Sequence, residues 1–405
     1  MAKKILKIVR NLFILITTPL LGLIIIYLVN PGFVEEKAYD WFYPTVNIDE
    51  KYINKIIVEV PEVYELMRIA CTLTDAFQND ANRINRNTNY YLEIESKLMR
   101  FKNHELVKKL NKFLLENRMA NQTAIRVLSL NYKLENNRLI FMETIDINPI
   151  LLKLFQSQVF MISGNIDLIE SFAKAINFGK FYNSHKEYYS KLIENFNKLC
   201  HPDDMKKWLE EKFDNKYQSY RIVFSPLTGG YHFTYCFFDE ERNADQAIMF
   251  VNAPGYDVVG LSQSEFEIDA SKTARNVFTE IDHNYVNPLS ENYIEEINSA
   301  VPNYKFWNRQ QRGYNSNLLT FNEYMTWGVF SLYAIDTYSN QNIDTIITIQ
   351  TNNMSNRQFI HFKEFNEELI KQYTIKSKPK IDSLYRPMLE WMKEKYFSEK
   401  DVEVN

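Results

Sequence analysis

One block of short strand-like runs interrupts a chain whose remaining periodicity is helical. Between Tyr220 and Gly255, three runs are rich in β-branched and aromatic residues, and the pairs Gly229-Gly230 and Pro254-Gly255 mark turns. On both sides of this block, apolar residues recur every three or four positions, which is the spacing of a helix face. The sequence therefore predicts an α+β fold that is mainly helical, with a small mixed or antiparallel sheet.

The same patterns give approximate bounds for the elements. A strand at 56–60 precedes Pro61, and proline suits the first turn of a helix. The strand-like runs cover 221–226, 228–238 and 246–255. Helical periodicity is found near 62–80, 88–118, 121–134, 148–162, 165–177, 181–200, 203–215, 270–286, 289–300, 320–338, 357–374 and 379–396.

The first 30 residues form a separate segment. Basic residues within 1–11 precede an uncharged apolar run at 12–29, which has about the 18–20 residues that cross a bilayer. Acidic residues follow at 35–40, so the charge pattern predicts a cytoplasmic N-terminus. No small-x-small site follows the run, which favours an uncleaved signal anchor over a cleaved signal peptide. We therefore expect one transmembrane helix at 12–29 and a main domain outside the cytoplasm, in the periplasm or on the cell surface.

Composition narrows the chemistry. The formal net charge is −4, which gives no basic field for nucleic acid. The ten glycines form no GxGxxG or Walker-type loop, and no GxSxG elbow is present. Cys71, Cys200 and Cys236 are far apart and form no CxxC, so a cysteine-based zinc site is excluded. Metal chemistry would have to draw on six histidines and on carboxylates.

The helix predicted next to the strands holds the one histidine at a motif position. Ser271 can cap this helix and Pro288 supplies its end. Thr279, Glu280 and His283 share one face, because offsets of three and four bring side chains together on a helix. Without further context, Glu280 and His283 would be an ordinary helical pair.

The segment TEIDHNYVNP, at 279–288, resembles the HExxHxxxNP-like segment of a bacterial zincin-like family catalogued as domain of unknown function 4932. Four other segments fit the same family in order: VEVPEVYELMRIA, NFGKFYNSHKEYY, SPLTGGYH and FNEYMTW. The resemblance covers roughly residues 55–340. It implies a zincin-like fold of gluzincin type, with peptide hydrolysis as the ancestral reaction.

The resemblance assigns roles to single residues. His283 matches the second histidine of the pattern, a metal ligand, and Glu280 matches the general base. Glu323, in FNEYMTW, matches the carboxylate ligand that a later helix donates. The first histidine is replaced by Thr279, whose hydroxyl is a poor zinc ligand beside imidazole or carboxylate. The HExxH motif is therefore degenerate in this sequence.

Three interpretations of the altered motif remain open. In the first, the metal site is lost and the fold persists as a binding module without a cofactor. In the second, another residue replaces the missing ligand for Zn²⁺ or another divalent transition metal, with His232 the best candidate and Asp282 a weaker one. In the third, Glu280 becomes a ligand beside His283 and Glu323, a set that suits iron or manganese better than zinc.

Some of these residues also have local interpretations. Thr320 and Glu323 form a Thr-x-x-Glu capping-box pattern, which would engage the carboxylate at a helix start. His232 can be interpreted as a structural histidine of a strand. Tyr314 is either a hydrogen-bond donor to an oxyanion, as tyrosines are in some zincins, or a surface aromatic residue. The remaining histidines have no partner at metal spacing and read as structural or exposed: His104, His185, His201 and His361.

We expect a membrane-anchored, extracytoplasmic metallopeptidase homologue with an altered metal site. The competing hypotheses are a catalytically inactive peptide-binding or scaffold protein of the cell envelope, and a helical envelope protein with no site. The expected partners are a peptide or protein, which an edge strand at 229–235 or 246–252 would pair with, and the membrane. The expected division is a basic tail at 1–11, the anchor at 12–29, a linker at 30–55, a helical region at 56–216, a zincin-like core at 217–340 and a C-terminal helical region at 341–405.

Overall fold

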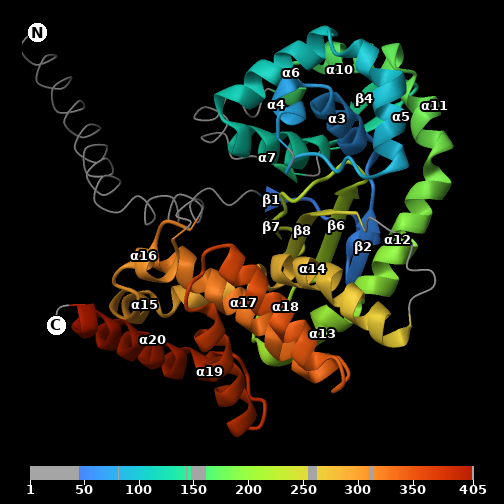
Figure 1. The fold of residues 1–405 in the computed structure, drawn as a ribbon. Helices are drawn as coiled ribbons and strands as arrows, with labels where there is room; N and C mark the ends of the chain where they lie inside the picture. The colour runs from blue at the N-terminus through green and yellow to red at the C-terminus, as the bar shows by residue number, and fades with distance from the viewer. Residues whose placement is uncertain are drawn as a thin grey trace, which may run out of the picture.

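The computed structural model describes residues 45–80, 82–142, 145–146, 161–253, 262–309 and 314–403. A mixed sheet lies in the middle of the molecule, with helices on both of its faces (Figure 1). The strands are β1 (Thr45–Val46), β2 (Lys55–Glu59), β3 (Tyr132–Glu135), β4 (Arg138–Phe141), β5 (Ile145–Asp146), β6 (Ser219–Ser225), β7 (Phe233–Asp239) and β8 (Ala244–Asn252). The α+β class, mainly helical with a mixed sheet, is confirmed.

The helices fall into two groups along the chain. Before β6 lie α3 (Glu62–Thr72), α4 (Asp75–Gln78), α5 (Asn89–Leu98), α6 (Glu105–Glu116), α7 (Arg118–Ser129), α10 (Ile166–Ala175), α11 (Phe178–Ser184), α12 (Lys186–Cys200), α13 (Pro202–Lys212) and the 3-10 turns η1 (Glu50–Tyr52) and η2 (Met99–Phe101). After β8 lie α14 (Gln263–Glu291), α15 (Ile294–Ala300), α16 (Tyr304–Trp307), α17 (Asn317–Thr337), α18 (Ile343–Asn356), α19 (Phe362–Ile375) and α20 (Asp382–Glu403).

The six-stranded sheet has the order β2-β6-β8-β7-β1-β5. β2, β6 and β8 are parallel, whereas β7 runs antiparallel to β8, from the pairing Phe233↔Phe250 to Asp239↔Ala244. β1 joins the far side of β7 at Thr45, near the carboxyl end of β7. The expectation that 246–252 is an edge strand is wrong, because β8 lies between β6 and β7. A separate hairpin of β3 and β4 replaces the end of the helix predicted at 121–134.

Side chains of the sheet alternate between two hydrophobic cores, as the period of two along a strand requires. Tyr220, Ile222 and Phe224 of β6 belong to the larger core, which extends through the helices of both groups. Val223, between them, belongs to a smaller core on the opposite face, together with Tyr64 of α3. Both faces of the sheet are therefore buried.

The longest helix, α14, runs past a proline that was predicted to end it. A capping box at Ser262 starts the helix, so Ser271 lies inside it and donates to the Ile268 carbonyl oxygen instead of capping. Pro288 lacks the N–H group that would bond the Asn284 carbonyl oxygen one turn earlier. The Tyr217 hydroxyl donates to that oxygen at 2.5 Å, and the helix continues to Glu291.

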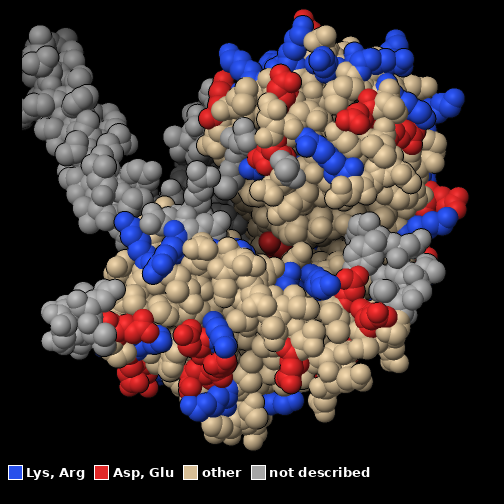
Figure 2. Space-filling model, viewed as in Figure 1, with Lys and Arg blue, Asp and Glu red and all other residues tan. Residues whose placement is uncertain are grey.

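Most helices of the two groups lie in different halves of the molecule, while α12 and α13 extend from the first group to α14. In Figure 1 the helices from α3 to α11 lie above the sheet, and α15 to α20 lie below it. α14 passes under the sheet between the halves and packs against β7, β8 and α17. The space-filling view shows a hollow between the halves, with acidic atoms recessed in it (Figure 2).

The prediction of a transmembrane helix is wrong for the part of the chain that the structure describes. Within the described ranges, no helix is long and apolar enough to cross a membrane. The long helices α14 and α20 carry charged residues along their length, and α17 buries its apolar residues in the core. The run at 12–29 lies outside the described residues. The predicted localisation, with a cytoplasmic N-terminus and an extracytoplasmic main domain, depended on that helix and is corrected with it.

Candidate functional site

The packing of α14 against α17 brings two of the predicted metal ligands together. His283 Nε2 of α14 lies 3.8 Å from Glu323 Oε2 of α17. The Glu323 side chain is 2% exposed and the His283 side chain is 22% exposed, so the pair lies at the boundary between core and solvent. The two residues are 40 positions apart in the sequence, and the tertiary fold alone joins them.

One oxygen of Glu323 is held and the other is open. The Trp327 indole N–H donates to Oε1 at 2.8 Å, and Arg357 Nη2 donates to the same oxygen at 2.5 Å. Oε2, which faces His283, is buried and has no hydrogen-bond partner among the described residues. The neighbours therefore fix the carboxylate and leave one oxygen available.

The capping-box interpretation of Glu323 is wrong. α17 begins three residues before Thr320, and Ser316 is its N-cap, accepting from the Leu319 N–H. Thr320 instead donates to the Tyr314 carbonyl oxygen at 2.9 Å. Glu323 consequently lies in the second turn of the helix, where its carboxylate cannot take part in N-terminal capping.

Contacts of Nδ1, the nitrogen that does not face Glu323, orient the ring of His283. Nδ1 lies 3.3 Å from Asn287 Oδ1 and 3.3 Å from the Thr326 hydroxyl oxygen. Metal-binding histidines usually hydrogen-bond through the nitrogen that is not on the metal, and that bond fixes tautomer and ring direction. Asn287 and Thr326 are placed to do this, which directs Nε2 to Glu323.

Glu280 lies one helical turn before His283 and is half-buried. Burial and then the nearby Glu323 carboxylate raise the pKa of its carboxyl group, Arg357 lowers it, and the net result is a pKa of about 8. A carboxyl group with a pKa near neutral can accept and return a proton under physiological conditions. Glu280 therefore has the proton affinity expected of a general base or acid.

Tyr314 and Arg357 complete the site from the far side of Glu323. Arg357 Nη2 donates to the Tyr314 hydroxyl oxygen at 2.9 Å, and its guanidinium lies 4.7 Å from the centre of the Trp327 ring. Burial alone would lower the pKa of Arg357, but Glu323 and Tyr314 together outweigh burial and raise it. No sequence pattern pointed to Arg357, which lies outside every quoted motif, whereas Trp327 belongs to FNEYMTW.

The position of the missing histidine offers no metal ligand. Thr279 is buried, and its hydroxyl donates to the Asn276 carbonyl oxygen of its own helix at 3.2 Å. Asp282 is fully buried with both carboxylate oxygens unpartnered, and burial, then Glu323 and Glu280, raise its pKa well above the usual range. In the described part of the chain, no group of three His, Cys, Asp or Glu side chains could hold a metal ion.

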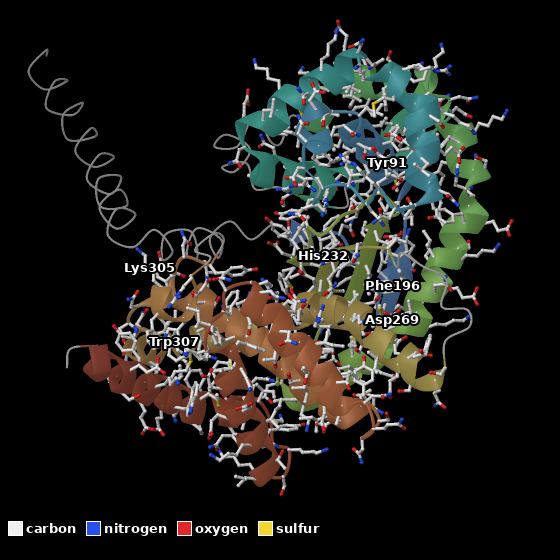
Figure 3. All side chains as sticks on the ribbon, in the orientation of Figure 1. Tyr91, Phe196, His232, Asp269, Lys305 and Trp307 are labelled. Carbon is white, nitrogen blue, oxygen red and sulfur yellow. The ribbon has the colours of Figure 1, made fainter. Side chains whose placement is uncertain are left out.

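His232 lies apart from these residues, just before β7. Figure 3 shows it at the level of the sheet, between the upper helices and α14. Burial, and then the positive charge of Arg126, lowers the pKa of His232 to about 4, so its imidazole is neutral near pH 7. Its Nε2 is buried without a partner among the described residues. The structure brings it into no contact with His283 or Glu323.

The family whose sequence model matches the chain is described as a domain of unknown function, DUF4932, and the match covers residues 45–384. The chain belongs to the DUF4932 family. No curated protein and no solved structure matches it significantly. The DUF4932 match includes every residue of the candidate site, from His232 through Glu280, His283, Glu323 and Arg357.

Proposed function

We propose that this DUF4932 protein is a zincin-like metallopeptidase homologue of gluzincin type with an altered metal site, which takes a peptide in the hollow between its two halves. The supporting observation is the approach of His283 Nε2 to Glu323 Oε2 at 3.8 Å. The remaining polar atoms of both side chains are occupied by neighbours, as in a preformed pair of ligands.

The residues fit a divalent transition metal with two protein ligands. Two ligands of a tetrahedral metal, each about 2.0–2.2 Å from it, lie roughly 3.4 Å apart, which is close to the separation of the two atoms here. An imidazole and a carboxylate suit zinc, iron or manganese. With Thr279 turned to its own helix, the site should bind metal more weakly than a three-ligand site.

The chain's own residues would supply the rest of the chemistry. A bound metal would polarise the peptide carbonyl and activate water. Glu280, in its ionised form, would accept the proton of that water and return it to the leaving amine. The Tyr314 hydroxyl, held by Arg357, would donate to the oxygen on which negative charge develops.

Metal binding to the purified full chain tests the site. Equilibrium dialysis against Zn²⁺ and Mn²⁺, with elemental analysis, should give one metal per chain in the wild type. His283→Ala and Glu323→Gln should each lose that metal, because each removes one of two ligands. His201→Ala is the matched control, since His201 is an exposed histidine next to Asp204 and should bind as the wild type does. Metal that survives His283→Ala unchanged would place the site elsewhere.

Restoring the missing ligand tests the relation to gluzincins. Thr279→His should raise zinc affinity at least roughly tenfold, the size of effect that even an outer-shell partner produces. It should also give chelator-sensitive cleavage of quenched fluorescent peptides, and Glu280→Gln in the same background should abolish cleavage while keeping the metal. No gain in affinity would refute the assignment of Thr279 to the first histidine position.

A second candidate function is peptide binding without catalysis. Two observations favour it: the Thr279 hydroxyl is engaged by its own helix, and Arg357 already neutralises Glu323 at 2.5 Å. Under this hypothesis, the wild type binds peptides with equal affinity in the presence and absence of a chelator and cleaves none of them. Chelator-sensitive turnover by the wild type would exclude it.

A further inference from the structure

A second group of polar side chains is buried above the sheet, away from the candidate site. We call it the buried arginine cluster, and it consists of Arg68 of α3, Arg83, Arg126 of α7, Tyr231 and His232. Arg68 and Arg126 are 2% and 1% exposed. The guanidinium carbons of Arg83 and Arg126 lie 4.6 Å and 5.3 Å from the centre of the same Tyr231 ring. His232 directly follows that ring in the sequence and feels the charge of Arg126.

Each of the two most buried arginines uses one nitrogen to hold a loop. Arg68 Nη2 donates to the carbonyl oxygens of Arg83 at 3.0 Å and Leu227 at 3.2 Å. Arg126 Nη1 donates to the Tyr231 carbonyl oxygen at 3.0 Å. These bonds fix the cluster between α3, α7 and the loop that enters β7, which makes it a preorganised set of donors.

The other nitrogens of these arginines are buried and have no partner among the described residues. They are Nε and Nη1 of Arg68 and Nε and Nη2 of Arg126. Further unpartnered buried atoms come from the same helix faces and the same loop: Tyr64 Oη, Gln122 Nε2, Thr228 Oγ1 and His232 Nε2. Buried polar groups are normally hydrogen-bonded, so this many open donors in one place calls for an acceptor.

Positive charge in the cluster exceeds negative charge. Arg83 forms an ion pair with Asp80 at 3.3 Å, but no carboxylate of the described chain pairs with Arg68 or Arg126. The nearby Glu65 accepts from the Tyr90 hydroxyl at 2.7 Å, and burial raises its pKa more than its hydrogen bonds and the charge of Arg68 lower it, which favours the uncharged form. A buried guanidinium without a counter-charge is unfavourable, and an anion would relieve it.

We propose that the buried arginine cluster binds one carboxylate group. The two open nitrogens of Arg126, Nε and Nη2, lie on one edge of the guanidinium, the edge that grips a planar carboxylate with two parallel hydrogen bonds. Arg68 and the Thr228 hydroxyl supply further donors. The carboxylate belongs to a small organic acid or to the C-terminus of a peptide, and neither source requires a metal in the candidate site.

The neighbouring loop indicates the side from which such a ligand would enter. A Cβ atom added at Gly229 would lie 2.4 Å from the Asn82 carbonyl oxygen, so this glycine packs tightly against the loop that carries Arg83. A Cβ added at Gly230 would meet no atom within 4 Å. Gly230 is exposed, so the chain beside Tyr231 borders solvent, and this is the side from which a ligand would reach the cluster.

Binding of defined probes to the full chain tests this proposal. Thermal unfolding and calorimetric titration should show saturable binding of acetate, or of a short peptide with a free C-terminus. Chloride should bind at least roughly tenfold more weakly than acetate, because a single-atom anion cannot accept the two parallel hydrogen bonds of this edge on separate oxygens. An amidated peptide that loses all affinity identifies a peptide C-terminus as the ligand. Acetate binding with no preference for the free over the amidated peptide identifies a small acid.

Substitutions separate a carboxylate site from a structural cluster. Arg126→Met should weaken acetate binding at least roughly tenfold, because hydrogen bonds to a charged group are the strong ones. Arg126→Lys keeps the positive charge but removes the two parallel N–H donors, so it should lose most of the preference for acetate over chloride. This variant keeps the test valid if the Met variant does not fold. Thr228→Val should weaken acetate binding without lowering the stability of the unliganded chain, because it removes an open hydroxyl. Arg100→Met, a change at an exposed arginine, is the matched control.

Two results would overturn the assignment. Acetate and free-carboxyl peptides that leave the unfolding temperature unchanged at high concentration would show that the cluster is structural. Equal affinity for acetate and chloride would show a general anion site instead. Both outcomes are independent of the metal experiments above, since those vary residues of α14 and α17.

Discussion

Removing Arg357 should expose how strongly Glu323 depends on its counter-charge. Glu323 is 2% exposed and accepts at Oε1 from Arg357 and Trp327. In Arg357→Met the carboxylate would keep the indole N–H and lose the cation. Breaking a buried ion pair by removing one partner costs about 3–5 kcal/mol. Arg357 is one quarter exposed, so we expect the lower end, about 3 kcal/mol.

Two further terms modify this value. Arg357 also lies over the Trp327 ring, and loss of that contact adds about 0.5–1 kcal/mol, part of which a methionine sulfur would return. Glu323→Gln keeps the shape and the Trp327 hydrogen bond, so it should cost only about 1 kcal/mol. In the double variant the carboxylate is no longer charged, and the combined loss should be smaller than the sum of the single losses by about 1–2 kcal/mol.

Urea unfolding of the full chain, followed by tryptophan fluorescence and circular dichroism, measures these differences as shifts of the midpoint at constant slope. Arg100→Met serves as the control and should lie within about 0.5 kcal/mol of the wild type. A loss below about 1 kcal/mol in Arg357→Met, or strictly additive effects in the double variant, would refute the interpretation of Glu323 as a buried charge that Arg357 neutralises.

The structure also determines whether three other substitutions raise or lower the free energy of unfolding. Gly328→Ala should lower the free energy of unfolding by about 1–3 kcal/mol in urea, because the new Cβ would lie 2.6 Å from Leu369 Cδ2. Added to Leu369→Ala, which itself destabilises a buried position, the same change should cost less, and an equal cost in both backgrounds would contradict the clash. His232→Asn should reduce the loss of stability at acid pH. Burial and Arg126 lower the pKa of His232 to about 4, so the stability that its neutral form contributes is present above the unfolded pKa of about 6.5 and is lost as the pH falls toward 4. Urea titrations at several pH values should measure this loss as up to about 3 kcal/mol in the wild type. Ser262→Ala should cost about 1 kcal/mol in the same assay, since it removes the capping box that starts α14, and an unchanged midpoint would contradict that role.

Local sequence patterns sufficed for the elements whose causes are local. The three strand-like runs correspond to β6, β7 and β8, because alternation, aromatic content and glycine turns are properties of neighbouring residues. The helix predicted at 320–338 is α17, shifted by a few residues because Ser316 rather than Thr320 caps it. The helical periodicity that places His283 on the face of Glu280 also holds in the structure.

Features with distant causes could not be predicted in this way. Pro288 was expected to end α14, but Tyr217, from a different part of the chain, bonds the carbonyl oxygen that the proline leaves open. Pro387 inside α20 repeats the arrangement, since Lys376 Nζ donates to the Ser383 carbonyl oxygen at 3.1 Å. A proline inside a helix is tolerated when a remote side chain satisfies its lost acceptor.

In the candidate site, too, some features follow from local sequence and others depend on distant residues. Spacing on one helix was enough to pair Glu280 with His283, and the family resemblance suggested Glu323. The Glu323–Arg357 ion pair crosses from α17 to the end of α18, and its partners share no sequence motif. The position of His232 beside Arg126 likewise depends on how α7 packs over the sheet, which neither residue's neighbours encode.

The pairing of the first long strand has a consequence for how the chain is made. Lys55 of β2 lies opposite Ser219 of β6, 164 positions later. At a synthesis rate of about 5–20 residues per second, β2 leaves the ribosome roughly 8–33 s before its partner exists. During that interval its hydrogen-bonding edges are open, as in any unpaired strand, and can be covered only by nascent helices or a chaperone. Closure of the central sheet is thus a late event, and the helices between these strands must remain able to rearrange until Ser219 has been added.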